Sequence, residues 1–499
     1  MFSEESMASI SNTSVYAFSS AIKHLAGLVQ RSKCEAYVVG GAVRDLLLGL
    51  DPGGVDIVVD SYPMEIAEQL SRHLDVKYFK LHDDHSTVRV LLQSEEFDQC
   101  VVDISGIKVS IMHDLAQRDF TCNALALPIE FAAASWGIDQ IIDGAAGVAA
   151  ISQRTLAAVS ERSFYQDPLR LLRAFRLAAE LDLDISEKTL GMVRRDAASI
   201  SEVAPERIRD ELLRIVGTSR SSECLELMAA SGILDQFLPE LTDGRGVQQP
   251  PEHQSDVLTH NLRTPGLLHR LVFSSDTPYK FAMHSPAYSE WRSKLVSEDF
   301  SDGYPRWNFL ALAGLLHDIG KPATKTTESG GRIRFLNHGL VGSQIAKALL
   351  LRLRFSSKAV NFVANAVGTH MRPSQIYVPG SLPTPKAMYR YHRDLNDMAE
   401  DVLFLSLADY LAAVQDTLEV EDWEYKCAVT DQVLNWNRQE SIAKKARYLD
   451  GHDIMQGFSL TEGPVIGHLL ALLDEAVALG TVRSREQALL YLGEVQVKL

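Results

Sequence analysis

The most constraining feature of the sequence is a change of pattern close to Pro168. Before it, short runs rich in Val and Ile alternate with helical spacing, which is typical of strands and helices that pack together. Strands are predicted at residues 36–39, 55–59, 88–92 and 100–104, and a helix at 41–48. After it, Leu, Ile and Ala recur at helical spacing almost to the end of the chain. The sequence therefore predicts an α/β or α+β head followed by a helical remainder.

Composition excludes several classes of protein. No apolar run approaches the roughly 18 residues of a membrane span. The N-terminal stretch carries Glu4 and Glu5 but no Lys or Arg, so neither a secretory signal nor a transit peptide is expected. The five cysteines are scattered and form no Cys-x-x-Cys, which predicts reduced thiols in a cytoplasmic protein.

The formal net charge of −16 argues against indiscriminate binding of nucleic acid, because such binding rests on neutralising phosphates. Residues 151–220 differ from the rest, with twelve Lys or Arg against eleven Asp or Glu. Any RNA is expected to bind there or in a similar local patch.

Two glycines stand where the first predicted strand ends and a helix begins. Gly40 and Gly41 allow backbone N–H groups to approach an anion, and the start of the helix adds a favourable dipole. Arg44, one turn later, can reach the same phosphates with two N–H groups. Taken alone, the pair of glycines favours a simple tight turn.

Two predicted strands each contain a single acid among apolar residues. Asp56 lies in the strand at 55–59 and Asp103 in the strand at 100–104. A carboxylate in such a strand is costly unless it is paired or binds metal, and Mg²⁺ bound to substrate phosphates uses such carboxylates. The alternative is that both aspartates face solvent at strand ends.

A third group of motifs is rich in arginine. The first reads Arg-Asp-Phe-Thr-Cys-Asn from Arg118, and the second begins at Asp167, which is predicted to cap a helix with Pro168 in its first turn. On that helix Asp167, Arg170 and Arg173 share a face, and we expect both arginines to be exposed. The alternative is a solvated charged stripe opposite the apolar residues.

In this order and at this spacing, the motifs resemble the bacterial-type (class II) tRNA nucleotidyltransferase and poly(A) polymerase family over residues 33–245. Residues 205–212 are similar to the base-selecting helix of that family. The resemblance implies catalytic Mg²⁺ at Asp56 and Asp103. It also implies nucleotide contacts from Gly40, Gly41, Arg44, Arg118, Asp119, Asn123, Asp167, Arg170, Arg173, Glu206, Arg207 and Arg209.

The implied reaction is template-independent transfer of nucleotides from CTP or ATP to an RNA 3′ end, above all the CCA end of tRNA. In this reaction the metal polarises the RNA 3′-hydroxyl for in-line attack on the α-phosphate, and pyrophosphate is released. The resemblance does not separate CCA addition from CC addition, A addition or poly(A) synthesis.

One position departs from the family. Its strand normally reads Asp-x-Asp, with both carboxylates on one face, whereas here Gly54 stands in the first position. Asp51 and Asp60 are near in sequence, but neither lies two residues from Asp56. Transfer is therefore expected to be slow or absent unless Asp51 or Asp60 substitutes for the missing acid.

A second constellation follows an apolar helix that ends in His317-Asp318-Ile-Gly-Lys-Pro. The pair alone equally suits a helix-end cap, but its order with His260 and Asp409 resembles the HD phosphohydrolase superfamily over residues 250–420. The resemblance implies a divalent metal at these four residues. His338 and His370 resemble the additional ligands of two-metal members. Mg, Mn, Fe, Ni and Zn all remain open.

Together these features predict a multidomain α+β protein with a nucleotidyltransferase α/β head, an all-helical neck and body, and a helical HD domain. The expected regions are the head at 33–160, the helical RNA-binding neck and body at 161–245, the HD domain at 246–425 with an insertion or surface loop near 272–306, and a helical C-terminal region at 426–499. The rival functions are an HD phosphohydrolase or phosphodiesterase with a degenerate head, and an RNA-binding scaffold in which both sites are degenerate. The HD substrate and the oligomeric state stay open.

Overall fold

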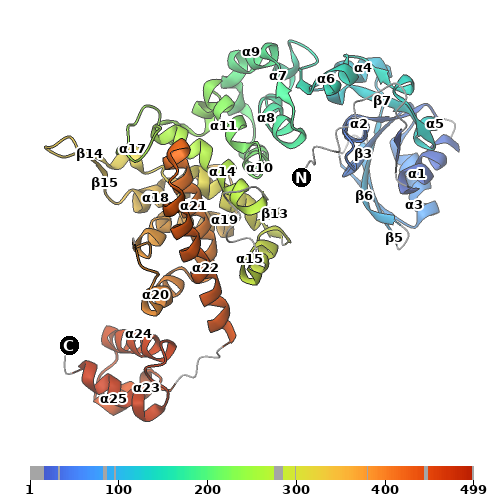
Figure 1. Cartoon of the computed structure of the whole chain (residues 1–499). Coiled ribbons are helices and arrows are strands. Elements are labelled where there is room, and N and C mark those ends of the chain that lie inside the picture. The colour runs from blue at the N-terminus through green and yellow to red at the C-terminus, as the bar shows by residue number, and fades with distance from the viewer. Residues whose placement is uncertain are drawn as a thin grey trace. The chain divides into compact units, whose positions relative to one another are not determined.

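The computed structural model describes residues 16–18, 20–31, 34–81, 87–94, 97–274, 285–297, 299–378, 380–442 and 448–496. They fall into two compact units (Figure 1). Unit 1 comprises Met1–Glu211 and Met228–Phe237, and unit 2 comprises Leu212–Leu227 and Leu238–Leu499.

Unit 1 is built on a seven-stranded sheet of order β4-β5-β6-β3-β2-β7-β9. Its strands are β2 (Ala36–Val39), β3 (Gly54–Val59), β4 (Lys77–Lys80), β5 (Thr87–Ser94), β6 (Phe97–Gly106), β7 (Leu125–Pro128) and β9 (Ile142–Asp143). The pair β3–β6 is parallel and the other neighbours are antiparallel. The four strands predicted from Val- and Ile-rich runs are therefore confirmed, and the predicted α+β head is present.

The sheet lies at the centre of the head, and its strand β2 is apolar on both faces. All four residues of β2 are buried, which is the pattern of a strand covered on two sides. On one face, Val39 and Val58 pack with Ile111 and Leu115 of helix α4. Helices around the sheet are α1 (Ser20–Arg31), α2 (Gly41–Leu47), α3 (Pro63–Leu74), α4 (Ile111–Ala116), α5 (Ile129–Ala132) and α6 (Gly147–Ser152).

Helices follow the sheet, as the sequence predicted. They are α7 (Ser163–Gln166), α8 (Arg170–Leu181), α9 (Glu187–Asp196), α10 (Pro205–Val216), α11 (Ser221–Ala230), α12 (Leu234–Phe237) and α13 (Pro239–Thr242). Arg176 of α8 donates to Glu211 of α10 at 2.6 Å, and both side chains are buried. One boundary was predicted wrongly: α8 begins at Arg170, and Asp167 lies in the turn before it, where its side chain accepts from the Leu169 N–H.

Unit 2 is mainly helical. Its longer helices are α14 (Val257–Phe273), α15 (Pro286–Ser297), α16 (Arg306–Leu316), α18 (His338–Arg352), α19 (Ser357–Thr369), α20 (Pro385–Leu395), α21 (Ala399–Val414) and α22 (Val420–Ile442). The short α17 (Lys321–Thr324) precedes a hairpin of β14 (Lys325–Thr327) and β15 (Ile333–Phe335). Helices α14, α16 and α21 pack together, because α16 and α21 are apolar around most of their circumference.

The predicted surface loop near 272–306 is wrong for its second half. Residues from Pro286 form α15, and β12 (Asp299–Ser301) then pairs with β13 (Tyr304–Pro305). Trp291 stacks on Phe404 at 4.1 Å and donates to buried Asp401. These tertiary contacts order a segment that has no periodicity of its own. Residues 275–284 lie outside the described residues.

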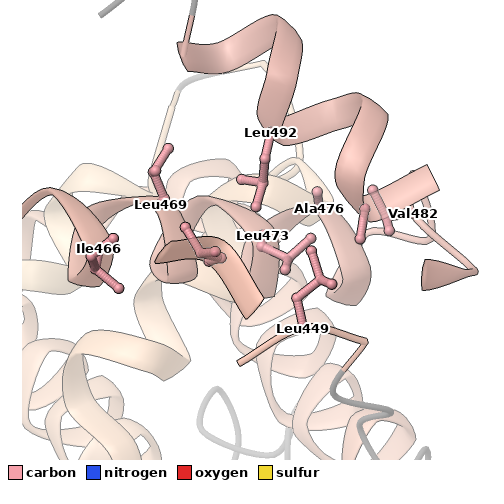
Figure 2. Close-up of a cluster of buried hydrophobic side chains, with 9 residues drawn as sticks. Leu449, Ile466, Leu469, Leu473, Ala476, Val482 and Leu492 are labelled. Carbon is pink, nitrogen blue, oxygen red and sulfur yellow. The ribbon is translucent and has the colours of Figure 1, made fainter. Parts of the chain in front are cut away.

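The C-terminal helices have a small core of their own (Figure 2). They are α23 (Gly451–Phe458), α24 (Pro464–Ala478) and α25 (Arg485–Gln496). Leu469 and Leu473 of α24 point into the cluster together with Leu492 of α25. Glu475 of α24 forms ion pairs with Lys386 and Arg390 of α20. No helix among the described residues is long and apolar enough to span a bilayer.

Replacing Leu469 by Ala is expected to destabilise this C-terminal core by about 2–5 kcal/mol, because a fully buried leucine leaves a cavity. The measurement is hydrogen exchange of the amides in α23, α24 and α25. Leu490→Ala is the matched control, since Leu490 is 70% exposed. If α24 amides of the Leu469 variant exchange at the parent rate, the cluster does not hold these helices together.

Candidate active sites

The first site lies on one face of the unit 1 sheet. Asp56 and Asp103 are register partners on the parallel strands β3 and β6, and Asp103 in turn faces Arg89 on β5. Side chains directly opposite each other in neighbouring strands share a face, so the three charges form a row across three strands. The acids predicted as metal ligands are thus adjacent, and a basic residue continues the row.

Arg89 holds Asp103 at two points. Its Nε donates to Oδ1 and its second guanidinium nitrogen to Oδ2, both at 2.8 Å. Although the Asp56 side chain reaches solvent, the surrounding protein desolvates its carboxylate and raises its pKa. Arg118 acts in the opposite direction, Asp103 adds to the increase, and Arg89 also lowers the pKa of Asp56. The sequence reasoning missed Arg89, although it is a lone charge in an apolar strand, just as Asp56 is.

Because residue 54 is glycine, the face of the sheet that carries Asp56 and Asp103 lacks the first acid of the Asp-x-Asp pattern. Gly54 lies in β3 without a left-handed φ, and a Cβ there would lie 3.3 Å from the Val101 carbonyl oxygen. Asp60 lies beyond the opposite end of β3, where its side chain accepts from the Glu35 N–H at 3.0 Å, so it cannot substitute for the missing acid. Among the described residues, no third acid, His or Cys joins Asp56 and Asp103 in a group that could hold a metal ion. The residues present therefore do not fit a two-ion centre.

The two glycines begin α2 as predicted, with a particular role for the first. Gly40 has φ +73°, and a Cβ there would lie 2.5 Å from a guanidinium nitrogen of Arg118. Its own N–H is already used, because it donates to the Leu125 carbonyl at 2.9 Å. The left-handed φ of this turn therefore favours glycine at position 40, and Arg118 lies against it.

Arg44 and Asn123 connect the glycine turn to the Arg-Asp-Phe-Thr-Cys-Asn motif. Arg44 is buried and donates to Asp45 and to the Asn123 side-chain oxygen. The Asn123 amide nitrogen donates to Asp119, and Arg118 donates to Asp114. Four predicted nucleotide-site residues thus share one connected region, and Arg44 already has protein partners there.

Arg173 is not the exposed side chain that we expected. It donates to Asp119 at 2.6 and 2.9 Å, and Asp119 is 8% exposed. Burial alone raises the pKa of Asp119, but Arg173 and the Asn123 hydrogen bond outweigh it, so the pKa is lowered. Arg170 is also half-buried and donates to the carbonyl oxygens of Ser163 and Gln117.

Arg173→Ala is expected to lower the stability of unit 1 by about 1–3 kcal/mol, because it leaves the buried Asp119 carboxylate without its partner. The measurement is hydrogen exchange of the α8 amides in the full chain. Adding Asp119→Asn to Arg173→Ala removes the unpaired charge and is expected to recover part of the loss. Equal protection in Arg173→Ala and the parent would show that the ion pair does not stabilise this region.

The remaining predicted nucleotide contacts lie around the start of α10. Arg207 donates to Asp167 at 3.1 Å, which joins the start of α10 to the turn before α8. Glu206 is exposed, whereas Arg209 is half-buried and bonds to the adjacent Asp210. The structure therefore connects Asp167 with Arg207.

The second site brings together all six predicted HD residues of unit 2. One ligand atom each from His260, His317, Asp318 and Asp409 lies within 4.8 Å of the others, and Asp318, His338 and His370 form a second such group. Asp318 belongs to both groups. Its Oδ2 lies 3.3 Å from Nε2 of His317, and its Oδ1 lies 3.4 Å from Nε2 of His338. A carboxylate placed in this way can bridge two ions.

Backbone carbonyls orient three of the histidines. Nδ1–H of His317 donates to Gly314, that of His338 donates to Phe335, and that of His370 donates to Val367. This arrangement leaves each Nε2 free to face the cluster, as in metal sites where a carbonyl fixes the imidazole tautomer. Sequence spacing predicts His317 and His370 at the ends of α16 and α19, and these carbonyls lie in the last turn of each helix.

The electrostatics of the cluster favour a bound cation. Burial alone would lower the pKa of His317, but Asp318 and Asp409 raise it to about 10. Both carboxylates have pKa values held well below the usual range, because the desolvation that opposes ionisation is outweighed by nearby positive groups. Both buried oxygens of Asp318 lack a hydrogen-bond partner among the described residues, although Nζ of Lys321 lies 2.5 Å from Oδ2. These nitrogen and oxygen donors fit divalent metal ions.

A cavity of about 740 Å³ opens beside this cluster. Asp318, His338 and Asp409 lie in its wall together with Lys321, His253 and the β14–β15 hairpin. The Lys321 ammonium in this wall suits an anionic ligand. Sequence reasoning did not assign His253 or Lys321 a role. Lys321 was visible in the Gly-Lys-Pro run, whereas His253 had no pattern around it.

Three family models match the chain. The poly A polymerase head domain matches residues 36–157, the RNA and SrmB binding site of polymerase A matches residues 182–244, and the HD domain matches residues 305–414. The sheet with its acids and the histidine–aspartate cluster therefore define a nucleotidyltransferase joined to an HD domain.

Two related proteins can be aligned with most of the chain. A CC-adding tRNA nucleotidyltransferase of Thermus thermophilus is 31% identical over 92% of this chain and 93% of its own length. An A-adding tRNA nucleotidyltransferase of Deinococcus radiodurans is 30% identical over 91% of this chain and 94% of its own. The chain belongs to the tRNA nucleotidyltransferase and poly(A) polymerase family.

The fold agrees with this assignment. The structure of the Bacillus stearothermophilus CCA-adding enzyme in complex with CTP aligns with a TM-score of 0.61 at 20% identity, covering 95% of this chain and 97% of that one. At this identity the likeness concerns the fold alone. A sheet head followed by a helical remainder is therefore an architecture already seen in a solved structure.

Proposed function

We propose that this chain adds nucleotides to the 3′ end of tRNA without a template, taking them from CTP or ATP. The carrying observation is the convergence of Gly40, Arg118 and Asp56, since Arg118 lies against the glycine turn and also acts on the Asp56 carboxylate. The names of the two relatives above support tRNA as the acceptor. Because one adds C and the other adds A, both nucleotides are candidate substrates.

Within this proposal, the contacts of several predicted residues support a role for each of them. The glycine turn and Arg118 hold the triphosphate, and the Asp119–Arg173 pair keeps that wall of the site in place. Asp167, Arg170 and Arg207 extend the nucleotide site toward α10, with base selection by Glu206, Arg207 or Arg209. The 3′-hydroxyl of the RNA attacks the α-phosphate, and pyrophosphate leaves.

The domain regions predicted from the sequence belong to the same proposal. The family-model matches at 36–157, 182–244 and 305–414 each lie within one of those regions, which supports the proposed limits. We also place the protein in the cytoplasm. Its five cysteines are free thiols, as expected in a reducing compartment.

The experiment presents the full chain with three tRNAs that lack one, two or three 3′-terminal nucleotides, each with labelled CTP or ATP alone. Label from CTP on the tRNA lacking all three indicates CC addition, and label from ATP on the tRNA lacking one indicates A addition. Both together indicate CCA addition. Long A tails on any acceptor would instead indicate poly(A) synthesis, and label on none of them would count against the proposal.

A second activity is favoured by the bridged histidine–aspartate cluster of unit 2. We infer that His260, His317, Asp318 and Asp409 hold one divalent ion and that His338 and His370, with Asp318, hold another. Metal bound there would activate water and polarise a phosphoester. Lys321 borders the cavity where such an ester would enter, so its phosphate would meet the Lys321 ammonium. His253 lies in the same wall, but burial lowers its pKa to about 4, so its imidazole is neutral.

A further inference from the structure

The transferase face of the sheet departs from a two-ion site at two positions. One acid is absent at Gly54, and a second acid, Asp103, is held by Arg89 through both of its oxygens. The two departures are linked by geometry, because Gly54, Asp56 and Asp103 lie on the paired strands β3 and β6, and Arg89 lies on the next strand of the same sheet.

The Arg89–Asp103 ion pair has the two-point geometry that is typical of strong guanidinium–carboxylate pairs. A guanidinium that binds a carboxylate at two points is fixed in orientation as well as in charge. The Asp103 side chain is 24% exposed and the Arg89 side chain is 42% exposed, so the pair lies where a ligand can reach it. A metal ion could bind Asp103 only by displacing one of these hydrogen bonds or by sitting beside a fixed positive charge.

We propose that Arg89 is a positioning residue of the transferase site: it withholds Asp103 from a divalent ion and supplies a fixed positive charge in its place, at the end of the row that runs from Asp56 through Asp103. In this proposal the site lacks both the carboxylate at position 54 and the divalent ion that this carboxylate would help to bind. Arg89 pairs with Asp103 on this face, and among the described residues no third carboxylate joins Asp56 and Asp103 in a group that could hold a metal ion. This inference rests on the proposed function for its location, but its main test is independent of turnover.

The test measures Mn²⁺ binding by electron paramagnetic resonance in the full chain, with Asp318→Ala in every variant so that the HD cluster contributes equally. Arg89→Met and Arg89→Gln release Asp103, and each is expected to tighten Mn²⁺ binding at the head about tenfold, the effect of roughly 1.4 kcal/mol. Arg89→Lys keeps the charge and is expected to stay within about threefold of the parent, as for a simple point charge. Adding Asp103→Asn to Arg89→Met is expected to abolish the gain.

Nucleotide incorporation provides the second readout, measured with Arg89 variants that keep Asp318. Arg89→Met should lower kcat, and Arg89→Lys should restore part of it. Equal Mn²⁺ affinity in the parent, Arg89→Met and Arg89→Gln would overturn the inference, as would equal tightening in Arg89→Lys. If the parent shows no incorporation, the Mn²⁺ result still stands, which separates failure of this inference from failure of the proposed function.

Discussion

Gly54→Asp is expected to raise the rate of nucleotide incorporation at least tenfold. The new carboxylate would lie two residues from Asp56 on the same face of β3, where the family has an acid. Asp103 is held by Arg89 at both oxygens, so among the described residues Asp56 has no free carboxylate beside it with which to bind a divalent ion and the substrate phosphates. Small misplacements of reacting groups can cost about 100-fold in rate. A carboxylate at position 54 that corrects such a misplacement can therefore raise the rate by the predicted factor. The measurement is pyrophosphate release with tRNA that lacks its terminal nucleotides, across a Mg²⁺ titration.

The backbone at Gly54 permits this test. Its φ is not in the left-handed region, and the closest neighbour of an added Cβ is one carbonyl oxygen at 3.3 Å, so a small shift suffices. Gly53→Asp is the matched control, because it adds the same charge one residue earlier, where a Cβ meets open space. Equal rates in the parent and both variants would show that the absent carboxylate does not limit transfer.

Asp318→Ala is expected to have the largest effect on bound metal. Because both oxygens of Asp318 face histidines of the two groups, its loss removes a ligand from each proposed ion at once. Metal content is expected to fall from about two ions per chain to fewer than one, and phosphoester hydrolysis to be lost. Metal content by mass spectrometry of the purified chain and hydrolysis of a chromogenic phosphodiester are the measurements.

Glu252→Ala provides the comparison for this variant. Glu252 is exposed and lines the same cavity, but it belongs to neither ligand group. It is expected to keep both metal and hydrolysis. Nucleotide incorporation should be unaffected by Asp318→Ala, since the head has its own acids. Unchanged metal content in Asp318→Ala would show that the cluster is not the metal site.

Residue types at fixed spacing predicted much of the architecture. Val- and Ile-rich runs gave the strands of the head, because a strand buried on both faces must be apolar along its whole length. The His317-Asp318 pair and its distant partners were predicted as one cluster, because their order resembles that of the HD phosphohydrolase superfamily. The acid Asp409 on an apolar helix agreed with this, since an unpaired carboxylate there is costly. The structure brings these residues together from α14, α16, α18, α19 and α21 or the ends of these helices.

Pairings across the fold were not predictable in the same way. Arg173 had the spacing of an exposed residue, and only the folded head shows that its guanidinium pairs with the buried carboxylate of Asp119. Arg89 meets Asp103 through the register of β5 on β6, which a single strand does not reveal. The segment from Pro286 has no periodicity, because Trp291 is ordered by Phe404 and Asp401, more than a hundred residues away.

The most direct test of nucleotidyl transfer follows two labels in parallel on truncated tRNA. With CTP or ATP labelled at the α-phosphate, Gly54→Asp is expected to place label in the RNA, and the parent is expected to do so more slowly. With the label at the γ-phosphate, the released label should appear only in pyrophosphate. Its amount should equal the amount of nucleotide incorporated into the RNA. Asp56→Asn should abolish both signals. Label from the γ-phosphate in RNA, or no α-label in RNA from either the parent or Gly54→Asp, would contradict the assignment.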